Sequence, residues 1–194
     1  MFARKKYDST ADSDKQVLKR FTVTSKDFII DRIKQLQCSY GAYSNSKGEP
    51  ISQEALALYV TVNPRDLKLA QVNLAKVLID KFIDANNVQN VYSLALTSIH
   101  NSKSKSIYID FDFDTLFPED VISCVESIIP RSCFTPLLTQ GGVHIMVNVN
   151  LVKDQNIKTN WHQAIKLIPG CDVTEDNLVP VPGCRQGNFV LKLL

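Results

Sequence analysis

Residues 106–114 (Ser-Ile-Tyr-Ile-Asp-Phe-Asp-Phe-Asp) constrain the fold of this chain most, because apolar and polar side chains alternate along them. Such alternation is typical of a half-buried β-strand, whose successive side chains point to opposite faces. One face is apolar, and the other carries Tyr108, Asp110, Asp112 and Asp114. Carboxylates about 7 Å apart along one rigid face repel each other. The sequence therefore predicts a strand whose acidic face needs a cation over it.

A second segment, residues 143–150 (Val-His-Ile-Met-Val-Asn-Val-Asn), alternates in the same way. Its polar face begins with His144, directly after the tight-turn signal Gly141-Gly142. If both strands lie in one sheet with their apolar faces on a common core, the acidic positions and His144 share the opposite surface. The imidazole could then hold a phosphate oxygen, and Gly142 would let a ligand approach the backbone closely.

Divalent metal ions are the cations that this acidic face favours, and two such ions held by carboxylates catalyse nucleotidyl transfer. For Asp110 and Asp112 the alternative is an exposed edge strand whose charges prevent aggregation. For His144 the alternative is a surface histidine that caps a turn. Asp172 and Asp176 are each either a third metal ligand or an ordinary turn residue. Arg185 is either a phosphate contact or a solvated side chain.

Helical and strand patterns interleave along the chain, which predicts an α+β fold with helices packed on a mostly antiparallel sheet. Residues 1–20 are polar and predict a loose N-terminal arm. The further elements that we expect are helices near 26–37, from Asn63-Pro64 to Phe82, at 118–129 and at 161–167, and strands at 57–62, 107–114, 133–138, 143–150 and 188–193. Residues 91–99 are expected to form a strand or another buried segment.

Composition limits the classes of function. The 194 residues carry a net charge of only +2, so the bulk charge gives no signal for nucleic acid. The five cysteines form no Cys-x-x-Cys pair, which favours reduced thiols over a zinc cluster or a disulfide framework. No apolar run reaches membrane-spanning length, and the first residues lack a secretory signal. We therefore expect no membrane association and a location in the cytoplasm of a prokaryotic or virus-infected cell.

Three motifs together resemble the archaeo-eukaryotic primase superfamily, and its small phage or plasmid primase-polymerases in particular. They are an Asp-x-Asp strand, a Gly-x-His strand and a carboxylate before a Pro-Gly turn. The matching positions lie within about 90–190: residues 109–112 (Ile-Asp-Phe-Asp), residues 142–144 (Gly-Val-His), and Asp172 or Asp176 ahead of residues 181–183 (Val-Pro-Gly). The third motif is the loosest, and the zinc-binding insert frequent in the family is not visible here.

The resemblance implies an RRM-like catalytic sheet in one domain over residues 21–194, with an N-terminal αβ unit at about 21–90 and the RRM-like unit at about 91–194. It also implies Mg²⁺ or Mn²⁺ bound by Asp110, Asp112 and Asp172 or Asp176, with His144, Gly142 and Arg185 at the nucleotide. The implied activity is DNA-directed primer synthesis in DNA replication, with nucleoside triphosphates and a single-stranded DNA template. A replicative helicase is left open as a partner.

Two other classes of function stay open from the sequence. The first is a different metal-dependent enzyme on a similar sheet, such as a nuclease. The second is a non-catalytic module that binds single-stranded nucleic acid. Such modules usually display aromatic side chains on the sheet for base stacking, whereas this face displays mainly aspartates.

Overall fold

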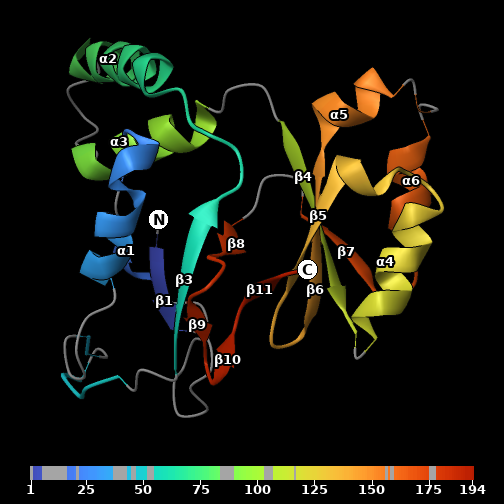
Figure 1. Ribbon diagram of the computed structural model, residues 1–194. Helices are drawn as coiled ribbons and strands as arrows, with labels where there is room; N and C mark the ends of the chain where they lie inside the picture. Colours follow the sequence, from blue (N-terminus) through green and yellow to red (C-terminus); the bar gives the residue numbers. More distant parts are fainter. Residues whose placement is uncertain are drawn as a thin grey trace. The chain divides into compact units, whose positions relative to one another are not determined.

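The computed structural model describes residues 2–5, 17–20, 22–36, 43–44, 47–51, 55–83, 90–102, 107–115, 117–155, 157, 160–174 and 178–194. They form helices and two antiparallel sheets, so the predicted α+β class is confirmed (Figure 1). The chain divides into two compact units: unit 1 takes Met1–Val62 and Tyr108–Leu194, and unit 2 takes Asn63–Ile107. This division differs from the predicted boundary near residue 90.

One sheet of unit 1, here called the acidic sheet, contains both alternating segments. Its order is β11-β5-β6-β4-β7, and every neighbouring pair is antiparallel. The strands are β4 (Tyr108–Asp114), β5 (Phe134–Leu138), β6 (Gly142–Asn148), β7 (Cys171–Thr174) and β11 (Lys192–Leu193). β4 and β6 pair along their whole length, so the condition that both segments lie in one sheet is met.

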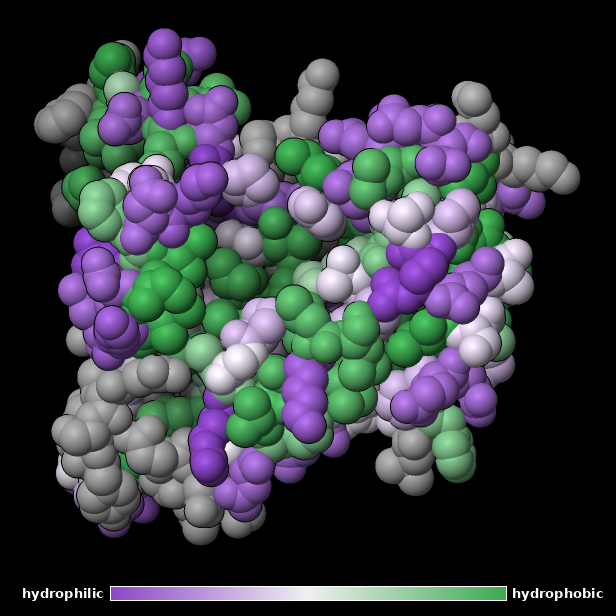
Figure 2. Space-filling model, viewed as in Figure 1, coloured by the Kyte–Doolittle hydropathy of each residue, from purple (hydrophilic) through white to green (hydrophobic). Residues whose placement is uncertain are grey.

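Three helices cover one face of the acidic sheet: α4 (Pro118–Glu126), α5 (Val149–Asp154) and α6 (Trp161–Lys166) (Figure 1). The buried core between them and the sheet contains Phe111 and Phe113 from β4, the alternate apolar residues of β6, and inward-facing side chains of the helices. Burial of each phenylalanine contributes about 1.5–3 kcal/mol. Hydrophilic side chains lie over the outer side of α5 (Figure 2). The opposite face of β4 is therefore left for the acidic residues.

The second sheet of unit 1 has the order β10-β9-β3-β1-β2, and β8 also pairs with β3. Its strands are β1 (Phe2–Lys5), β2 (Val17–Arg20), β3 (Leu56–Thr61), β8 (Leu178–Pro180), β9 (Arg185–Gln186) and β10 (Phe189–Val190). β1 and β2 lie within the segment expected to be a loose arm, so that expectation is corrected for these two stretches. β1 pairs with β3 and β2 pairs with β1, and these pairings satisfy their backbone groups, which composition alone does not reveal.

A short helical segment precedes β3 in the chain. The 3₁₀ turn η1 (Lys26–Phe28) continues into α1 (Ile29–Leu36), and the Ser25 hydroxyl accepts a hydrogen bond from the Asp27 N–H at 3.3 Å. Ser25 therefore caps the start of this segment. The Tyr43 hydroxyl donates to the carbonyl of Leu36 at 3.1 Å, which satisfies one of the unpaired carbonyls at the end of α1.

Unit 2 is built from α2 (Leu67–Ile83) and α3 (Val91–Asn101). The expectation of a strand at residues 91–99 is wrong: the Asn90 side chain accepts from the Tyr92 N–H at 3.0 Å and so starts a helix. The cap of α2 also differs from the expected Asn63. The Asp66 carboxylate accepts from the Leu69 N–H at 2.9 Å, and Asn63 bonds the backbone of Ile107 instead.

Three further boundaries differ from the sequence expectations. α4 ends at Glu126, and a 3₁₀ turn, η3 (Arg131–Cys133), leads into β5. β6 ends at Asn148 rather than at residue 150, because the Asn148 side chain accepts from the Asn150 N–H at 3.1 Å and starts α5. The expected last strand at 188–193 is divided between β10 and β11, which belong to different sheets.

Candidate functional site

The register of the acidic sheet places three candidate residues in one row. Asp112 of β4 lies opposite His144 of β6 on one side and opposite Asp172 of β7 on the other. Residues directly opposite in an antiparallel pair point to the same face. Asp110 lies one row along the same strand, between Met146 and Thr174. The face that the helices leave uncovered thus brings together Asp110, Asp112, His144 and Asp172.

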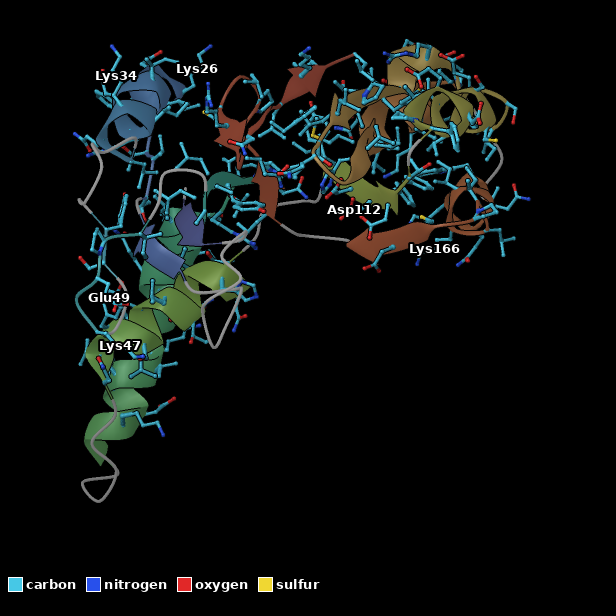
Figure 3. The ribbon with its side chains drawn as sticks, turned by 90° about the horizontal axis from the view of Figure 1, so that it is seen from below. Lys26, Lys34, Lys47, Glu49, Asp112 and Lys166 are labelled. Atoms are coloured by element: carbon cyan, nitrogen blue, oxygen red, sulfur yellow. The ribbon has the colours of Figure 1, made fainter. Side chains whose placement is uncertain are left out.

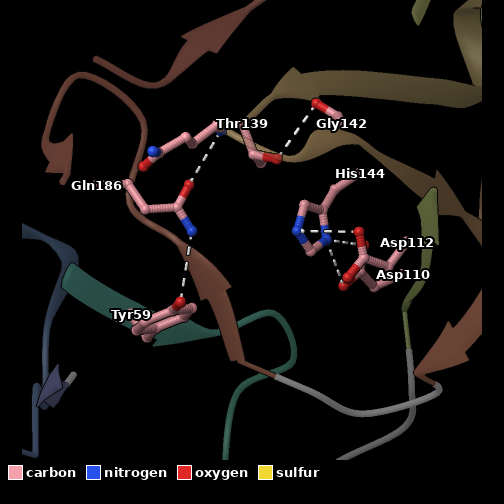
Figure 4. Close-up of polar contacts among 8 residues, drawn as sticks. Tyr59, Asp110, Asp112, Thr139, Gly142, His144 and Gln186 are labelled. Atoms are coloured by element: carbon pink, nitrogen blue, oxygen red, sulfur yellow. Dashed lines mark hydrogen bonds and ion pairs between the residues drawn. The ribbon is translucent and has the colours of Figure 1, made fainter. Parts of the chain in front are cut away.

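The His144 ring lies between two of these carboxylates (Figure 4). Its Nδ1 is 3.0 and 3.1 Å from the two carboxylate oxygens of Asp110, and its Nε2 is 3.4 Å from Oδ1 of Asp112. A neutral imidazole has a single N–H, so only the doubly protonated ring donates to both carboxylates. In its protonated form the ring would offset part of the acidic charge.

The two aspartates differ in their exposure. The Asp110 side chain is 1% exposed and the Asp112 side chain is 35% exposed. A buried carboxylate needs a charged or hydrogen-bonding partner, and His144 is that partner for Asp110. The Asp112 side chain and the exposed Asp172 remain open to a ligand from solvent. The site therefore combines a buried carboxylate, Asp110, with two carboxylates that solvent reaches, Asp112 and Asp172.

The pKa of the Cys171 thiol shows that the three carboxylates act on the same place in the sheet. The pKa of Cys171 is raised to about 11, first by burial and then by the negative charges of Asp172, Asp112 and Asp110. The Lys166 ammonium, from the end of α6, opposes them (Figure 3). All three aspartates thus act on the electrostatic potential at one point of the sheet.

The donor set fits hard divalent cations, because Mg²⁺ and Mn²⁺ prefer carboxylate oxygens. Asp112 and Asp172 are like charges directly opposite each other, which is unfavourable without a cation. Within the described ranges, no three His, Cys, Asp or Glu side chains are close enough to enclose an ion by themselves. Water or substrate oxygens would therefore have to complete the coordination. Asp176, the alternative third carboxylate, lies outside the described residues.

The other two predicted residues, Gly142 and Arg185, make no direct side-chain contact with the row in the described part of the chain. Gly142 packs against β4: a Cβ at this position would be 1.9 Å from the carbonyl oxygen of Phe113. Its lack of a side chain is thus explained by strand pairing, and its expected nucleotide contact stays a prediction. Arg185 is exposed on β9, and in the described part of the chain no hydrogen bond or ion pair joins it to Asp110, Asp112 or His144.

Sequence reasoning missed Gln186, whose amide bonds the turn before His144. A single glutamine between Arg185 and Gly187 carries no periodic or motif signal. Only the pairing of β9 with β3 brings it to this position.

Comparison of the chain with protein-family models, with curated proteins and with solved structures gives no match. In the described segments, every helix is too short or too polar to cross a lipid bilayer. The candidate site must therefore be interpreted from its own geometry.

Proposed function

We propose that this protein is a template-dependent nucleotidyltransferase of the primase-polymerase type that uses Mg²⁺ or Mn²⁺ and acts on single-stranded DNA. One observation carries the proposal: His144, Asp112 and Asp172 form one row across three strands, with Asp110 beside it on the face opposite the helices. A set of carboxylates next to an imidazole matches the charges of metal-bound nucleoside triphosphate.

In this proposal Asp110, Asp112 and Asp172 hold the divalent ions, which would activate a 3′-hydroxyl and neutralise charge on the triphosphate. The chain itself supplies rigid placement, because the opposite faces of β4 and β6 are locked in the core. His144, whose Nδ1 is held by Asp110, would direct its Nε2–H toward a phosphate oxygen. Positioning and charge neutralisation provide most of the rate in such transfers.

The order of the strands also supports the proposal. The succession β4, α4, β5, β6, α5 with α6, and β7 is a β-α-β-β-α-β unit in which β6 lies between β4 and β5. This split β-α-β arrangement is that of ferredoxin-like sheets. It is consistent with the RRM-like catalytic sheet that the resemblance implies, while the function itself is argued from the site.

The test is primer synthesis and extension on a single-stranded DNA template with nucleoside triphosphates and Mn²⁺. We expect product from the native protein and a loss of at least about a hundredfold in Asp112→Asn, because a charged ligand becomes neutral. Asp120→Asn is the matched control, since Asp120 is exposed on α4. Normal synthesis by an Asp110→Ala, Asp112→Ala double variant that remains folded would overturn the proposal.

A metal-dependent nuclease is the second candidate, and the pairing of buried Asp110 with Nδ1 of His144 favours it. A carboxylate that orients a histidine is a common arrangement for a general base that activates water. The same incubation separates the two functions, because degradation of the template without extension would indicate the nuclease.

A further inference from the structure

Gln186 is a buried polar residue whose side chain connects the two sheets of unit 1. It is 1% exposed. Its Oε1 accepts a hydrogen bond from the backbone N–H of Gln140 at 3.3 Å, and its Nε2 donates to the Tyr59 hydroxyl at 3.5 Å (Figure 4). A buried amide that lost these partners would be costly, so the two contacts fix its conformation.

The two partners of Gln186 belong to different sheets. Tyr59 lies in β3, two residues from Ala57, which pairs directly with Gln186. Gln140 lies in the turn between β5 and β6 of the acidic sheet. The N–H and the hydroxyl of Thr139 both donate to the carbonyl of Gly142, at 2.9 and 3.2 Å, which closes this turn. The turn ends two residues before His144.

We propose that Gln186 is a positioning residue for nucleotide binding: it holds the turn at residues 139–142 against β9 and so fixes how β6 presents His144. This inference rests on the proposed function. It also concerns the chain that follows the Val-Pro-Gly motif at residues 181–183. Arg185, the other predicted phosphate contact, immediately precedes Gln186 on β9. Adjacent strand residues point to opposite sides, so burial of Gln186 leaves Arg185 exposed. One side chain thereby fixes the placement of both predicted phosphate contacts.

Three substitutions separate positioning from simple packing. Gln186→Leu keeps a similar volume but removes both hydrogen bonds. Gln186→Glu keeps an oxygen that accepts from the Gln140 N–H and can also accept from the Tyr59 hydroxyl. Tyr59→Phe removes only the partner of Nε2 and leaves the bond to the turn intact. We therefore expect Gln186→Leu to change amide exchange at Gln140 and the KM for nucleotide the most. Gln186→Glu and Tyr59→Phe should remain close to the native protein in both measurements.

The first measurement is amide hydrogen exchange at Gln140 by NMR, which needs neither nucleotide nor activity. We expect exchange about tenfold faster in Gln186→Leu, which corresponds to the 1.4 kcal/mol of one buried hydrogen bond. Amides of β4, which do not contact Gln186, should be unchanged and report that the sheet remains folded. Unchanged exchange at Gln140 would overturn the proposal at its first step.

The second measurement is steady-state primer extension on single-stranded DNA with Mn²⁺, varying the nucleotide concentration. We expect the KM for nucleotide to rise about tenfold in Gln186→Leu with kcat within about twofold, and to be restored in Gln186→Glu. Faster Gln140 exchange with an unchanged KM would limit Gln186 to a structural role and overturn the positioning proposal. Absence of extension by the native protein would reject the proposed function. In that case a nucleotide-binding assay tests the positioning role separately, and unchanged affinity in Gln186→Leu would reject it.

Discussion

Among single residues, His144 decides the electrostatics of the acidic sheet. Its ring nitrogens approach Asp110 at 3.0 Å and Asp112 at 3.4 Å, so one ring contacts two carboxylates. Because Asp110 is buried, its attraction to the ring is screened little by solvent or salt. The same ring is the proposed phosphate contact, so stability and binding depend on one side chain.

The buried pair gives a stability prediction. Asp110→Ala and His144→Ala should each lower the free energy of unfolding by about 3–5 kcal/mol, because each leaves a buried charged partner uncompensated. The double variant should lose less than the sum, with a coupling of about 1–3 kcal/mol. Urea unfolding of the four proteins measures this cycle. Strict additivity would contradict a direct pairing of the two residues.

For catalysis, His144→Ala should mainly raise the KM for nucleotide, since the ring is proposed to contact the triphosphate rather than the reacting hydroxyl. Steady-state extension with varied nucleotide concentration measures the effect. An unchanged KM in a folded His144→Ala protein would argue against the triphosphate contact.

Cys171 reports on the acidic row through its titration. Its pKa is raised from the ordinary value of 9.0 to about 11, so the rate of alkylation by iodoacetamide should rise with pH around about 11 in the native protein. At pH 8, about one Cys171 thiol in a thousand is ionised. Mass spectrometry of the labelled peptide over a pH series gives the midpoint. A native midpoint near 9 would contradict the burial and charge described for this thiol.

Asp172→Asn tests whether that carboxylate lies over the sheet beside Cys171. Removal of its negative charge, which favours the neutral thiol, should lower the alkylation midpoint. Asp154→Asn is a suitable control, because Asp154 is an exposed residue of α5. An identical shift in both variants would indicate an effect of net charge alone.

At the scale of elements, the pairing of β4 with β6 creates the site. The register is continuous from Tyr108↔Asn148 to Asp114↔Gly142, and a slip of one residue would move every aspartate into the core. Close approach of the two backbones at Gly142 leaves no room for a side chain. The register is therefore fixed both by the apolar face and by this glycine.

Gly142→Ala and Gly141→Ala form a matched pair that tests this register. A Cβ on Gly142 would lie 1.9 Å from the Phe113 carbonyl oxygen, whereas a Cβ on Gly141 would meet only Asp114 Oδ1 at 3.5 Å. We expect Gly142→Ala to lower the free energy of unfolding by more than about 3 kcal/mol and Gly141→Ala by less than about 1 kcal/mol. Urea denaturation measures both, and equal losses would contradict the described pairing.

In the architecture of the chain, hydrogen bonds join the first residues of unit 2 to its last residues. The Asn63 side chain, 0% exposed, accepts from the Ile107 N–H at 3.0 Å, and these are the first and last residues of the unit. Nearby, the Asp66 N–H donates to the carbonyl of Ser102 at 2.7 Å, and the Arg65 guanidinium donates to the carbonyl of His100 at 2.9 Å. These bonds join the start of α2 to the end of α3.

Asn63→Ala should therefore loosen unit 2. Loss of the acceptor for the Ile107 N–H should cost about 1–3 kcal/mol and speed amide exchange in α2 and α3. Asn101→Ala, at an exposed position in the last turn of α3, is the control and should leave exchange nearly unchanged. Equal amide protection of α2 and α3 in the Asn63→Ala and Asn101→Ala variants would show that the hydrogen bond from the Ile107 N–H to Asn63 does not stabilise unit 2.

Much of the fold followed from local pattern. Alternation predicted β4 and β6, and the helical pattern at 118–129 predicted α4, because these signals depend on neighbouring residues alone. Residues 91–99 were misinterpreted since a buried strand and a helix segment share an apolar composition, and Asn90 decided between them. Strand β1 depends on pairing with β3, which lies far along the chain, and β2 in turn pairs with β1.

The two-residue period of β-structure is a local property of the backbone, so the residue pattern alone placed Asp110 and Asp112 on one face of a strand. Assembly of distant strands into one sheet was needed to set His144 and Asp172 on either side of Asp112, and to bring Gln186 to the turn before His144. Strand order and register depend on how distant apolar faces share one core, and that free energy belongs to the assembled sheet rather than to any segment of it.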